Sequence, residues 1–372
     1  MREKVQILLI QMNKNRKKPD GLRIIQAIDA GGWGGAENVV VKLANGLAKR
    51  GHYVEVWVRR GSFLSEKLID DVKVKVVPFL NDYEPFTTAR FVHALRNYDI
   101  VNVHLGRAAR VSGYAAKISP GLPRKRLICH MHSYHKPRHY RLHKSIICVS
   151  KVIEEYVTLN MPWVERTWVV HNGINTERAI EAVPLVPKNT GVIRIGLLAT
   201  FKDPKGHADL LLAFSRMSPD IRCELILGGT GETLEPMKKL ASDLGIADKV
   251  VFTGFVPPED IFSFWRSLDV ACLPSKAEGF CLSAVEAMAS GLPVVAYAEP
   301  ALSEVIDDNG ILVTRGDTEA LAYTLEKVAR DASLREKYSR LSLERSKRFT
   351  ADAMVEKTLE VYREVVQESR LE

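Results

Sequence analysis

The sequence predicts an α/β protein made of two parallel sheets. Short apolar runs typical of strands alternate with helical patterns along almost the whole chain. A chain of 372 residues is long for one domain and suits two. The proline-rich segment 183–190 interrupts the alternation. We therefore expect one domain at residues 1–182 and a second that begins at residue 183.

In the first half, strand 22–28 leads into the glycine-rich loop 31–35 and the helix 36–49. Gly51 ends that helix before strand 53–58 begins. Further strands are expected at residues 72–77, 100–104, 127–132 and 145–149. Parallel strands need crossover connections, and the helices between these runs supply them.

The second half repeats the same alternation. Its strands are expected at residues 193–199, 223–227, 250–253, 270–273 and 294–298. Helices fit residues 207–217 and 234–244, and the chain from Thr318 onward is nearly all helical in pattern. In open sheets of this kind, ligands bind at the carboxyl ends of the strands, so site residues are expected in the loops that follow them.

Composition indicates a soluble globular protein, with 46% hydrophobic and 26% charged residues. The apolar run at residues 5–12 is short, contains two glutamines and lacks a small-residue cleavage site, which favours neither a signal peptide nor a membrane span. The five cysteines form no Cys-x-x-Cys pair, as expected for reduced thiols in the cytoplasm.

Charge is unevenly distributed along the chain. Residues 1–180 hold 30 Lys and Arg against 15 Asp and Glu, whereas residues 181–372 hold 23 against 30. The first half is therefore expected to face something anionic, such as a phosphorylated acceptor, a membrane surface or nucleic acid. Ordinary solubilising charge is the alternative.

Two glutamates frame an expected helix start in the second half, in the stretch Glu278-Gly-Phe-Cys-Leu-Ser-Ala-Val-Glu286. Free N–H groups at a helix start bind anions such as phosphate. Eight helical residues would span about 12 Å, roughly the reach from a hexose across a diphosphate to a ribose. The pattern indicates a nucleotide-sugar site, although ordinary surface glutamates could also produce this spacing.

The surrounding residues carry a resemblance to a known family. Pro274-Ser-x-x-Glu278-Gly-Phe and Glu286-Ala-Met-Ala-x-Gly-x-Pro293 resemble the signature of retaining glycosyltransferases of the GT-B fold, family 4 (group 1). The resemblance implies two Rossmann-like domains facing across a cleft. The first, at residues 1–182, would bind the acceptor and the second, at residues 183–347, the nucleotide sugar. The last helix, at residues 348–372, would cross back onto the first domain. It covers the chain from Leu22.

Within this motif, the resemblance assigns separate roles to the two glutamates. Glu278 would hold hydroxyls of the donor sugar as a catalytic residue, and Glu286 would accept the ribose hydroxyls. The residues expected at the phosphates are Phe280, Cys281, Leu282 and Ser283. Cys281 is a departure, because relatives commonly have glycine there. Glu304 lacks the glycines usual before it and is expected at a helix start.

Three loops complete the expected donor site. Lys205 matches the family's Lys-Gly and would neutralise the leaving diphosphate as a catalytic residue. Thr200 stands where the family has arginine, so Lys202 is expected to supply the second charge. The other residues expected around the donor base are Gly229, Gly231, Thr253 and Phe255. Surface lysines and an ordinary glycine turn are the alternatives.

In the first half, Gly34 and Gly35 match the family's glycine loop, whose N–H groups would approach the donor. A tight strand-to-helix turn is the alternative. Trp33 is expected to stack on an acceptor sugar. The resemblance makes His132 a catalytic residue near the donor sugar and the acceptor hydroxyl.

Five of the ten histidines cluster at residues 129–143. A metal site there is disfavoured, because proline interrupts the helical spacing and the family's transferases usually need no metal. The cations expected to bind an anionic acceptor or lipid surface are Lys136, Arg138 and Arg141. A solvated loop is the alternative.

The resulting prediction is a retaining hexosyltransferase using a nucleoside-diphosphate sugar, with a UDP-sugar favoured and no metal or cofactor. The acceptor is expected to be a hydroxyl of a lipopolysaccharide, glycolipid or other surface glycan, reached by an enzyme peripheral to the inner membrane face. No nucleic acid is expected. A nucleotide-sugar epimerase of the same fold and a non-catalytic nucleotide-sugar-binding subunit remain open. A dinucleotide-dependent oxidoreductase is disfavoured, because only Glu55 offers an acidic residue near the glycine loop.

Overall fold

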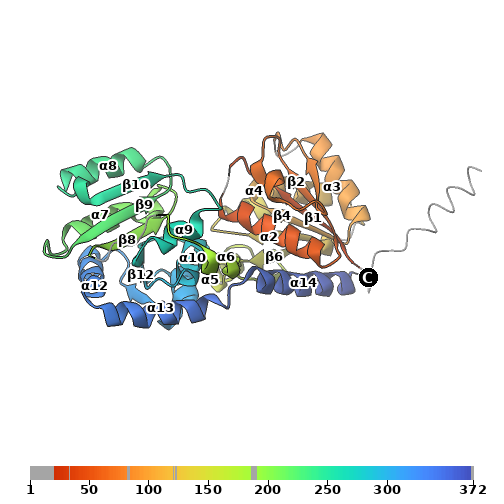
Figure 1. Cartoon of the computed structure of the whole chain (residues 1–372). Coiled ribbons are helices and arrows are strands. Elements are labelled where there is room, and N and C mark those ends of the chain that lie inside the picture. Colours follow the sequence, from red (N-terminus) through yellow and green to blue (C-terminus); the bar gives the residue numbers. More distant parts are fainter. Residues whose placement is uncertain are drawn as a thin grey trace, which may run out of the picture. The chain divides into compact units, whose positions relative to one another are not determined.

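The computed structural model describes residues 21–32, 34–81, 84–119, 121, 124–185 and 191–369. The chain divides into two compact units, each built on one parallel sheet (Figure 1). The first unit comprises Met1–Cys148, Glu154–Val170 and Val355–Glu372, and the second comprises Val149–Ile153 and His171–Met354. The predicted α/β class with two parallel sheets is confirmed.

The first sheet has seven strands in the order β3-β2-β1-β4-β5-β6-β7, and all neighbours are parallel. The strands are β1 (Arg23–Ile28), β2 (Tyr53–Val58), β3 (Lys73–Val76), β4 (Ile100–His104), β5 (Leu127–Met131), β6 (Ser145–Cys148) and β7 (Arg166–Val169). Every residue of the central strands β4 and β5 is buried, as expected for a parallel sheet covered on both faces.

The helices of the first unit connect these strands as crossovers. They are α2 (Gly35–Lys49), α3 (Pro85–Asn97), α4 (Gly106–Lys117) and α5 (Lys151–Asn160), with 3₁₀ turns η1 (Phe63–Lys67), η2 (Arg124–Arg126) and η3 (Pro137–Tyr140). The side chain of Glu84 begins α3 by accepting hydrogen bonds from the N–H groups of Phe86 and Thr87 at 2.8 Å, with a proline at the first helical position.

The C-terminal helix α14 (Ala351–Glu368) lies alongside the first sheet from Val355 onward (Figure 1). Val355 packs into Gly46 of α2 so closely that a Cβ at Gly46 would lie 2.5 Å from it. Arg166 of β7 forms an ion pair with Glu364, and the buried Tyr362 reaches the interior of the unit. A sequence-distant helix is therefore part of the first unit.

The second sheet has six parallel strands in the order β10-β9-β8-β11-β12-β13. They are β8 (Ile193–Leu198), β9 (Cys223–Gly228), β10 (Val250–Gly254), β11 (Val270–Leu273), β12 (Val294–Tyr297) and β13 (Ile311–Val313). The strands β11 and β12 are buried throughout, so the core runs along the centre of the sheet.

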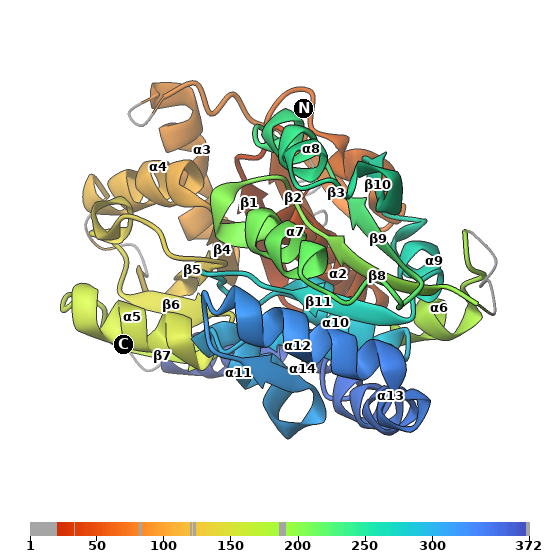
Figure 2. The same ribbon diagram turned by 90° about the vertical axis from the view of Figure 1, so that its left-hand side faces the viewer.

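Helices cover this sheet on both faces. They are α6 (Thr176–Glu181), α7 (His207–Ser215), α8 (Leu234–Asp243), α9 (Ile261–Arg266), α10 (Leu282–Ala289), α11 (Pro300–Ile306), α12 (Thr318–Arg330) and α13 (Ala332–Ser346), with 3₁₀ turns η4 (Asp203–Lys205), η5 (Ala247–Lys249) and η6 (Asp307–Asn309). Figure 2 shows α7 and α12 side by side, where Arg216 bonds to Thr318 at 2.6 Å.

Two strands were not expected from the sequence. β7 has four half-buried residues at one edge of its sheet, and β13 has three residues at the edge of the other. Segments this short carry too little alternation to predict a strand, and edge strands make only half the pairing. The expected strands recur within two residues of their predicted ends.

The units do not divide at residue 183. Residues 149–153 and 171–182, which were expected in the first domain, pack with the second unit, because Lys151 and His171 both hydrogen-bond to Glu304 of α11. Residues 1–20 and Trp33 lie outside the described residues. Among the described residues, no helix combines the length and apolarity needed to cross a bilayer.

Candidate functional site

In the second unit, the loops with predicted donor residues follow β8, β9, β10 and β11. These four strands are neighbours and parallel, so their carboxyl ends meet at one edge of the sheet. The structure therefore brings to this edge the predicted residues Thr200, Lys202, Lys205, Gly229, Gly231, Thr253, Phe255, Glu278, Phe280, Cys281, Leu282 and Ser283. Loops that are distant in sequence converge because the strands are parallel.

Lys205 and Glu278 contact each other directly at this edge. Lys205 Nζ lies 2.7 Å from Glu278 Oε1 and 2.9 Å from Oε2. The Glu278 side chain is only 8% exposed, against 29% for Lys205. Burial acts to lower the pKa of Lys205, but the Glu278 carboxylate and the other acidic groups nearby together outweigh it, so the pKa lies above its usual value. Lys205 therefore stays protonated at neutral pH, next to the hydrogen-bond acceptor Glu278.

Glu299 holds the backbone of Glu278 in place, and the sequence analysis missed this role. The N–H of Glu278 donates to Glu299 Oε1 at 3.3 Å, and the N–H of Leu302 donates to Oε2 at 3.1 Å. Burial raises the pKa of the Glu299 carboxyl, which is 2% exposed. The available signal was the Glu299-Pro300 pair, since a capping carboxylate followed by proline is typical of a helix start.

Cys281 occupies a left-handed backbone conformation, with φ 69° and ψ 77°, immediately before α10. Glycine adopts this conformation without strain, whereas other residues crowd Cβ against the following carbonyl. The conformation explains in physical terms why a glycine suits this position. The Cys281 side chain is 9% exposed, and burial raises the pKa of its thiol well above the usual value.

The prediction that eight helical residues span the distance from Glu278 to Glu286 is wrong. Helix α10 begins only at Leu282, so four of the eight steps form a non-helical loop. The N–H groups of Leu282 and Ser283 lie in the first turn, where a helix offers them no acceptor. Ser283 donates its hydroxyl proton to the carbonyl of Leu198 at 2.8 Å, which ties α10 to β8 and occupies the proton that was expected to reach a phosphate.

Glycines Gly229 and Gly231 are required by the packing of one loop on another. Their φ angles are 127° and 156°. A Cβ at Gly229 would lie 2.0 Å from the carbonyl oxygen of Ala199, and one at Gly231 would lie 2.3 Å from that of Phe201. The loop after β9 therefore lies directly against the loop after β8.

The remaining donor candidates lie at the surface of this edge. Thr200, Lys202 and Thr253 are exposed, and Phe255 is 59% exposed. A cavity of about 390 Å³ opens beside the loop after β8 and includes Lys202 among its lining residues. Glu286 is buried at 6% exposure within α10.

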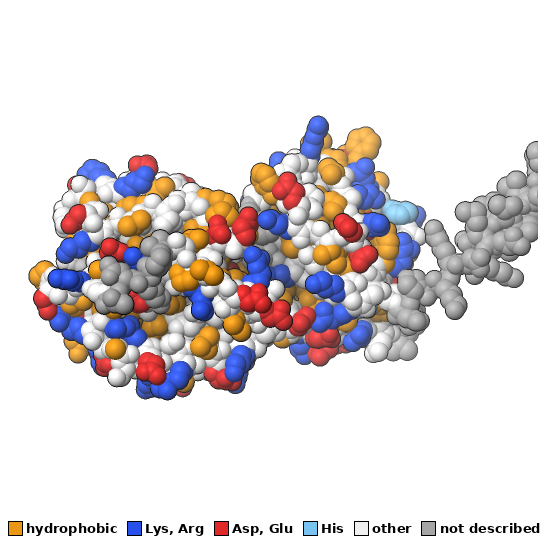
Figure 3. Space-filling view, viewed as in Figure 1, with side chains coloured by type: hydrophobic (Ala, Val, Ile, Leu, Met, Phe, Trp, Pro, Cys, Tyr) orange, Lys and Arg blue, Asp and Glu red, His pale blue; other side chains and the backbone are white. Residues whose placement is uncertain are grey.

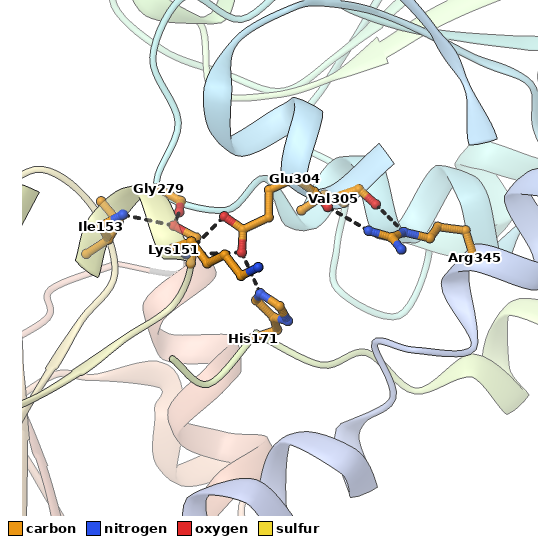
Figure 4. Close-up of polar contacts among 8 residues, drawn as sticks. Lys151, Ile153, His171, Gly279, Glu304, Val305 and Arg345 are labelled. Atoms are coloured by element: carbon orange, nitrogen blue, oxygen red, sulfur yellow. Dashed lines mark hydrogen bonds and ion pairs between the residues drawn. The ribbon is translucent and has the colours of Figure 1, made fainter. Parts of the chain in front are cut away.

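Glu304 was expected at a helix start. It lies instead near the end of α11. Its carboxylate accepts the N–H of Lys151 at 2.9 and 3.0 Å and faces His171 Nε2 at 2.7 Å (Figure 4). Arg345 donates to the Glu304 carbonyl at 2.7 Å. Glu304 therefore caps the first turn of α5 and holds the chain on either side of the segment 154–170.

The loop before α10 is held by residues close in sequence to Lys151 and His171, and by Phe349. Ser150 donates its hydroxyl to the carbonyl of Gly279 at 2.6 Å. The ring of Phe280 stacks on His171 at 5.7 Å and meets Phe349 edge-on at 5.6 Å. The Phe280 side chain is thus a packing element, and only its backbone N–H remains a candidate for phosphate.

In the first unit, the predicted residues also lie at the carboxyl ends of neighbouring strands. Gly34 and Gly35 follow β1, and His132 follows β5, with β4 between them. Gly34 caps α2 with φ −159°, an extended conformation open to any residue. A Cβ at Gly34 would approach Glu37 Oε2 to 3.2 Å.

Three histidine rings stack at this edge. The centroids of His130 and His132 are 4.8 Å apart, and each lies 5.1 Å from that of His104. His104 Nδ1 and His132 Nε2 are 2.9 Å apart. Burial lowers the pKa of His130 to about 3, and burial and neighbouring imidazoles lower those of His104 and His132 well below 6.5. The group is therefore neutral at physiological pH.

The other histidines of the run point elsewhere. His143 Nε2 donates to the carbonyl of Ala109 at 2.7 Å, and His135 bonds to Ser133 at 3.3 Å. No group of three or more His, Cys, Asp or Glu residues is arranged to hold a metal within the part of the chain that the structure describes. The exposed cations around η3 are Lys136, Arg138 and Arg141.

Comparison with known families identifies both halves of the chain. Residues 179–344 match the model described as glycosyl transferases group 1, and residues 33–178 match glycosyltransferase family 4. The D-inositol 3-phosphate glycosyltransferase of Acidothermus cellulolyticus is 28% identical over 91% of this chain and 88% of that protein.

Solved structures share the fold. The Anabaena protein HepE, determined with UDP and glucose, matches with a TM-score of 0.78 at 20% identity over 92% of this chain and 100% of that one. WaaG, described as a glycosyltransferase involved in lipopolysaccharide biosynthesis, matches with a TM-score of 0.69 at 17% identity over 90% and 99%. The two sheets therefore form the GT-B fold.

Replacing Cys281 tests the left-handed loop. Cys281→Gly should leave the thermal unfolding midpoint nearly unchanged, because relief of about 1–2 kcal/mol of backbone strain offsets a backbone entropy cost of about 0.5–1 kcal/mol. Cys281→Val should lower it, since a β-branched residue is strained there. Cys281→Ala controls for loss of the thiol. A valine variant as stable as the glycine variant would contradict the assigned conformation.

Acidification tests the neutral histidine stack. The pKa values of these histidines in the folded protein lie below 6.5. Their contribution to stability is therefore complete above pH 6.5 and is lost as the pH falls, down to about pH 3 for His130. His130 alone should cost about 2 kcal/mol of unfolding free energy at pH 5. Urea unfolding of the wild type and of His130→Phe between pH 7.5 and about 5 measures this. Equal pH slopes in both proteins would contradict the buried neutral ring.

Proposed function

The chain belongs to glycosyltransferase family 4, and from that membership we propose that it transfers a hexose from a UDP-sugar to a hydroxyl of a surface glycan or glycolipid, with retention of configuration. It is a nucleotide-sugar-dependent glycosyltransferase of the GT-B fold. The observation that carries the proposal is the Lys205–Glu278 contact at the edge where the four loops meet.

The Lys205–Glu278 contact suits the central part of a nucleotide-sugar donor. The β-phosphate and the sugar hydroxyls are neighbours in such a molecule, so a cation for one and a carboxylate for the other must also be neighbours. We assign Lys205 to the leaving diphosphate and Glu278 to the sugar hydroxyls. The first-turn N–H groups of Leu282 and Ser283 would share the phosphate charge.

The nucleoside end is assigned to the flanking loops. Glu286 would accept the ribose hydroxyls, and the exposed Phe255 and Thr253 would flank the base beside the glycine turn at Gly229 and Gly231. UDP is favoured because the HepE structures contain UDP with glucose in one case and UDP-glucose in another. Lys202, exposed beside Thr200, is proposed as the second cation at the diphosphate.

Retention is proposed to proceed by attack on the same face that the diphosphate leaves. The acceptor oxygen forms its bond to the anomeric carbon as the bond to the phosphate oxygen breaks, and that phosphate oxygen receives the acceptor's proton. Stabilising the departing diphosphate with Lys205 and the start of α10 is then the main catalytic contribution. His132 is proposed to contact the donor sugar or the acceptor hydroxyl.

An anionic acceptor is proposed from the exposed cations of the first unit. Lys136, Arg138 and Arg141 are all exposed around η3, close in sequence to His132. The name of the Acidothermus cellulolyticus relative contains D-inositol 3-phosphate, a phosphorylated compound, and WaaG is described as involved in lipopolysaccharide biosynthesis. On the face drawn in Figure 3, cationic and acidic side chains are interspersed over both units. We therefore assign binding of the anionic acceptor to the cations around η3 and not to the overall charge of the first unit.

Donor chemistry is tested by measuring nucleoside-diphosphate release from a panel of nucleotide sugars. Lys205→Ala and Glu278→Gln should each lower turnover at least about a hundredfold, the usual scale for one charged contact in a transition state. The matched controls are Lys238→Ala and Glu235→Gln, an exposed ion pair on α8, which should retain normal rates. Near-normal turnover in either site variant would move the chemistry elsewhere.

The same panel separates the alternatives. Conversion of one nucleotide sugar into another without acceptor would identify an epimerase. Donor binding without release or transfer, with every acceptor extract tried, would identify a non-catalytic binding subunit. Either result would overturn the transferase proposal.

A peripheral membrane location is tested by co-sedimentation with vesicles. The chain should bind phosphatidylglycerol-containing vesicles better than neutral ones, and the Lys136→Ala/Arg138→Ala/Arg141→Ala variant should bind about a hundredfold more weakly, at about 1 kcal/mol per cation. The matched control replaces the three cations of η2 (Arg124–Arg126) with alanine. If the wild type does not bind, or both variants lose binding equally, the assignment to η3 fails.

A further inference from the structure

We propose that His104 is a positioning residue that fixes the tautomer of His132, so that His132 presents a bare Nδ1 as hydrogen-bond acceptor to a substrate hydroxyl. The substrate part of this inference rests on the proposed transferase function. The tautomer part does not, since it follows from contacts within the first unit.

The argument starts from a chain of buried hydrogen bonds between β1, β4 and the residue after β5. His104 Nε2 lies 2.8 Å from Gln26 Oε1, and His104 Nδ1 lies 2.9 Å from His132 Nε2. Gln26 and His104 are 0% exposed, so no water competes for these contacts. These hydrogen bonds therefore link the interior of the sheet to the ring of His132, a predicted catalytic residue.

A neutral imidazole has one donating and one accepting nitrogen. The carbonyl oxygen of Gln26 can only accept, so His104 Nε2 must carry the hydrogen. His104 Nδ1 is then an acceptor, and His132 Nε2 must donate to it. The hydrogen of His132 is thereby placed on Nε2, which leaves Nδ1 with its lone pair.

Three further contacts agree with this orientation of the Gln26 amide. Gln26 Nε2 donates to the Tyr362 hydroxyl at 2.9 Å. Asn102 Nδ2 donates to Gln26 Oε1 at 3.0 Å and to the Tyr362 hydroxyl at 2.8 Å. Since Oε1 accepts from both Asn102 and His104, the amide nitrogen is directed away from the histidine. Tyr362 of α14 thus anchors the start of the chain of hydrogen bonds.

Both rings must remain neutral for the tautomer to be defined. Burial and the neighbouring imidazoles keep the pKa of His104 and of His132 well below 6.5, so neither ring takes a second proton near pH 7. His130 lies parallel to His132, with an angle of 2° between the rings, and so restrains the plane of the ring. His104 sets the tautomer, and His130 sets the orientation.

The Nδ1 atom of His132 is the part of this arrangement that is available to a substrate. Its Nδ1 is buried and has no hydrogen-bond partner among the described residues, although the residue as a whole is partly exposed. An unpaired buried acceptor costs about 1–3 kcal/mol, so natural structures keep few of them. A hydroxyl of the donor sugar or the acceptor would satisfy it.

The tautomer can be read directly from the full chain labelled with ¹⁵N-histidine. Long-range ¹H–¹⁵N correlation distinguishes Nε2–H from Nδ1–H rings, and comparison with a His132→Gln spectrum assigns the signal. We expect the Nε2–H form for His132 without any substrate present. A His132 ring protonated on Nδ1 would overturn the proposal, whether or not any variant folds.

Two variants of His104 test its part. His104→Phe keeps the stacked ring but removes both nitrogens, so His132 should become a mixture of tautomers and transfer turnover should fall about tenfold or more with little change in donor KM. His104→Asn retains an acceptor near the position of Nδ1 and should restore much of the Nε2–H signal and turnover. An unchanged His132 spectrum in His104→Phe would overturn the role of His104.

The readouts separate this inference from the proposed function. If no donor or acceptor supports transfer while His132 shows the Nε2–H form and His104→Phe disturbs it, the proposed function fails and the positioning role stands. If transfer is active and insensitive to His104→Phe, the positioning role fails and the transferase assignment stands.

Discussion

Parallel strand pairing is the constraint on which the rest of the structure depends. Parallel neighbours send their carboxyl ends to one edge of a sheet, so each loop that follows a strand meets the loops of its neighbours there. In the second unit this brings Lys205, after β8, to Glu278, after β11, although 73 positions separate them in sequence. In the first unit it brings His104 to His132 in the same way. An antiparallel connection would have sent these residues to opposite edges.

Three carboxylates of the second unit, two of them buried and Glu304 half-buried, have different tasks because their partners differ. Glu278 accepts both of its side-chain hydrogen bonds from the Lys205 ammonium group. Glu299 accepts backbone N–H groups and holds the loop that carries Glu278. Glu304 accepts the N–H of Lys151 and the ring of His171 and holds the chain where it passes between the units. The same side-chain type forms an ion pair, holds a loop or joins two segments of the chain, depending on which donor lies within reach.

One polar network of the first unit is buried and neutral. Gln26, Asn102, His104 and Tyr362 form a network in which desolvation excludes charge and each contact restricts the next. The C-terminal helix supplies Tyr362 to that network, so its packing on the first sheet has a chemical consequence as well as a stabilising one. His132 is the last member of the chain of hydrogen bonds and the one with an unused nitrogen.

The sequence by itself determined the two-sheet α/β class, most strand positions and the family, because strand alternation and the Glu278–Glu286 motif are local patterns. It also indicated that Cys281 departs from glycine, but only the fold revealed the left-handed backbone that makes glycine suitable there. The tertiary structure alone decided the roles of Glu299 and Glu304 and the tautomer of His132. Those roles depend on hydrogen bonds between segments far apart in the chain, and no local pattern records which distant donor a buried acceptor meets.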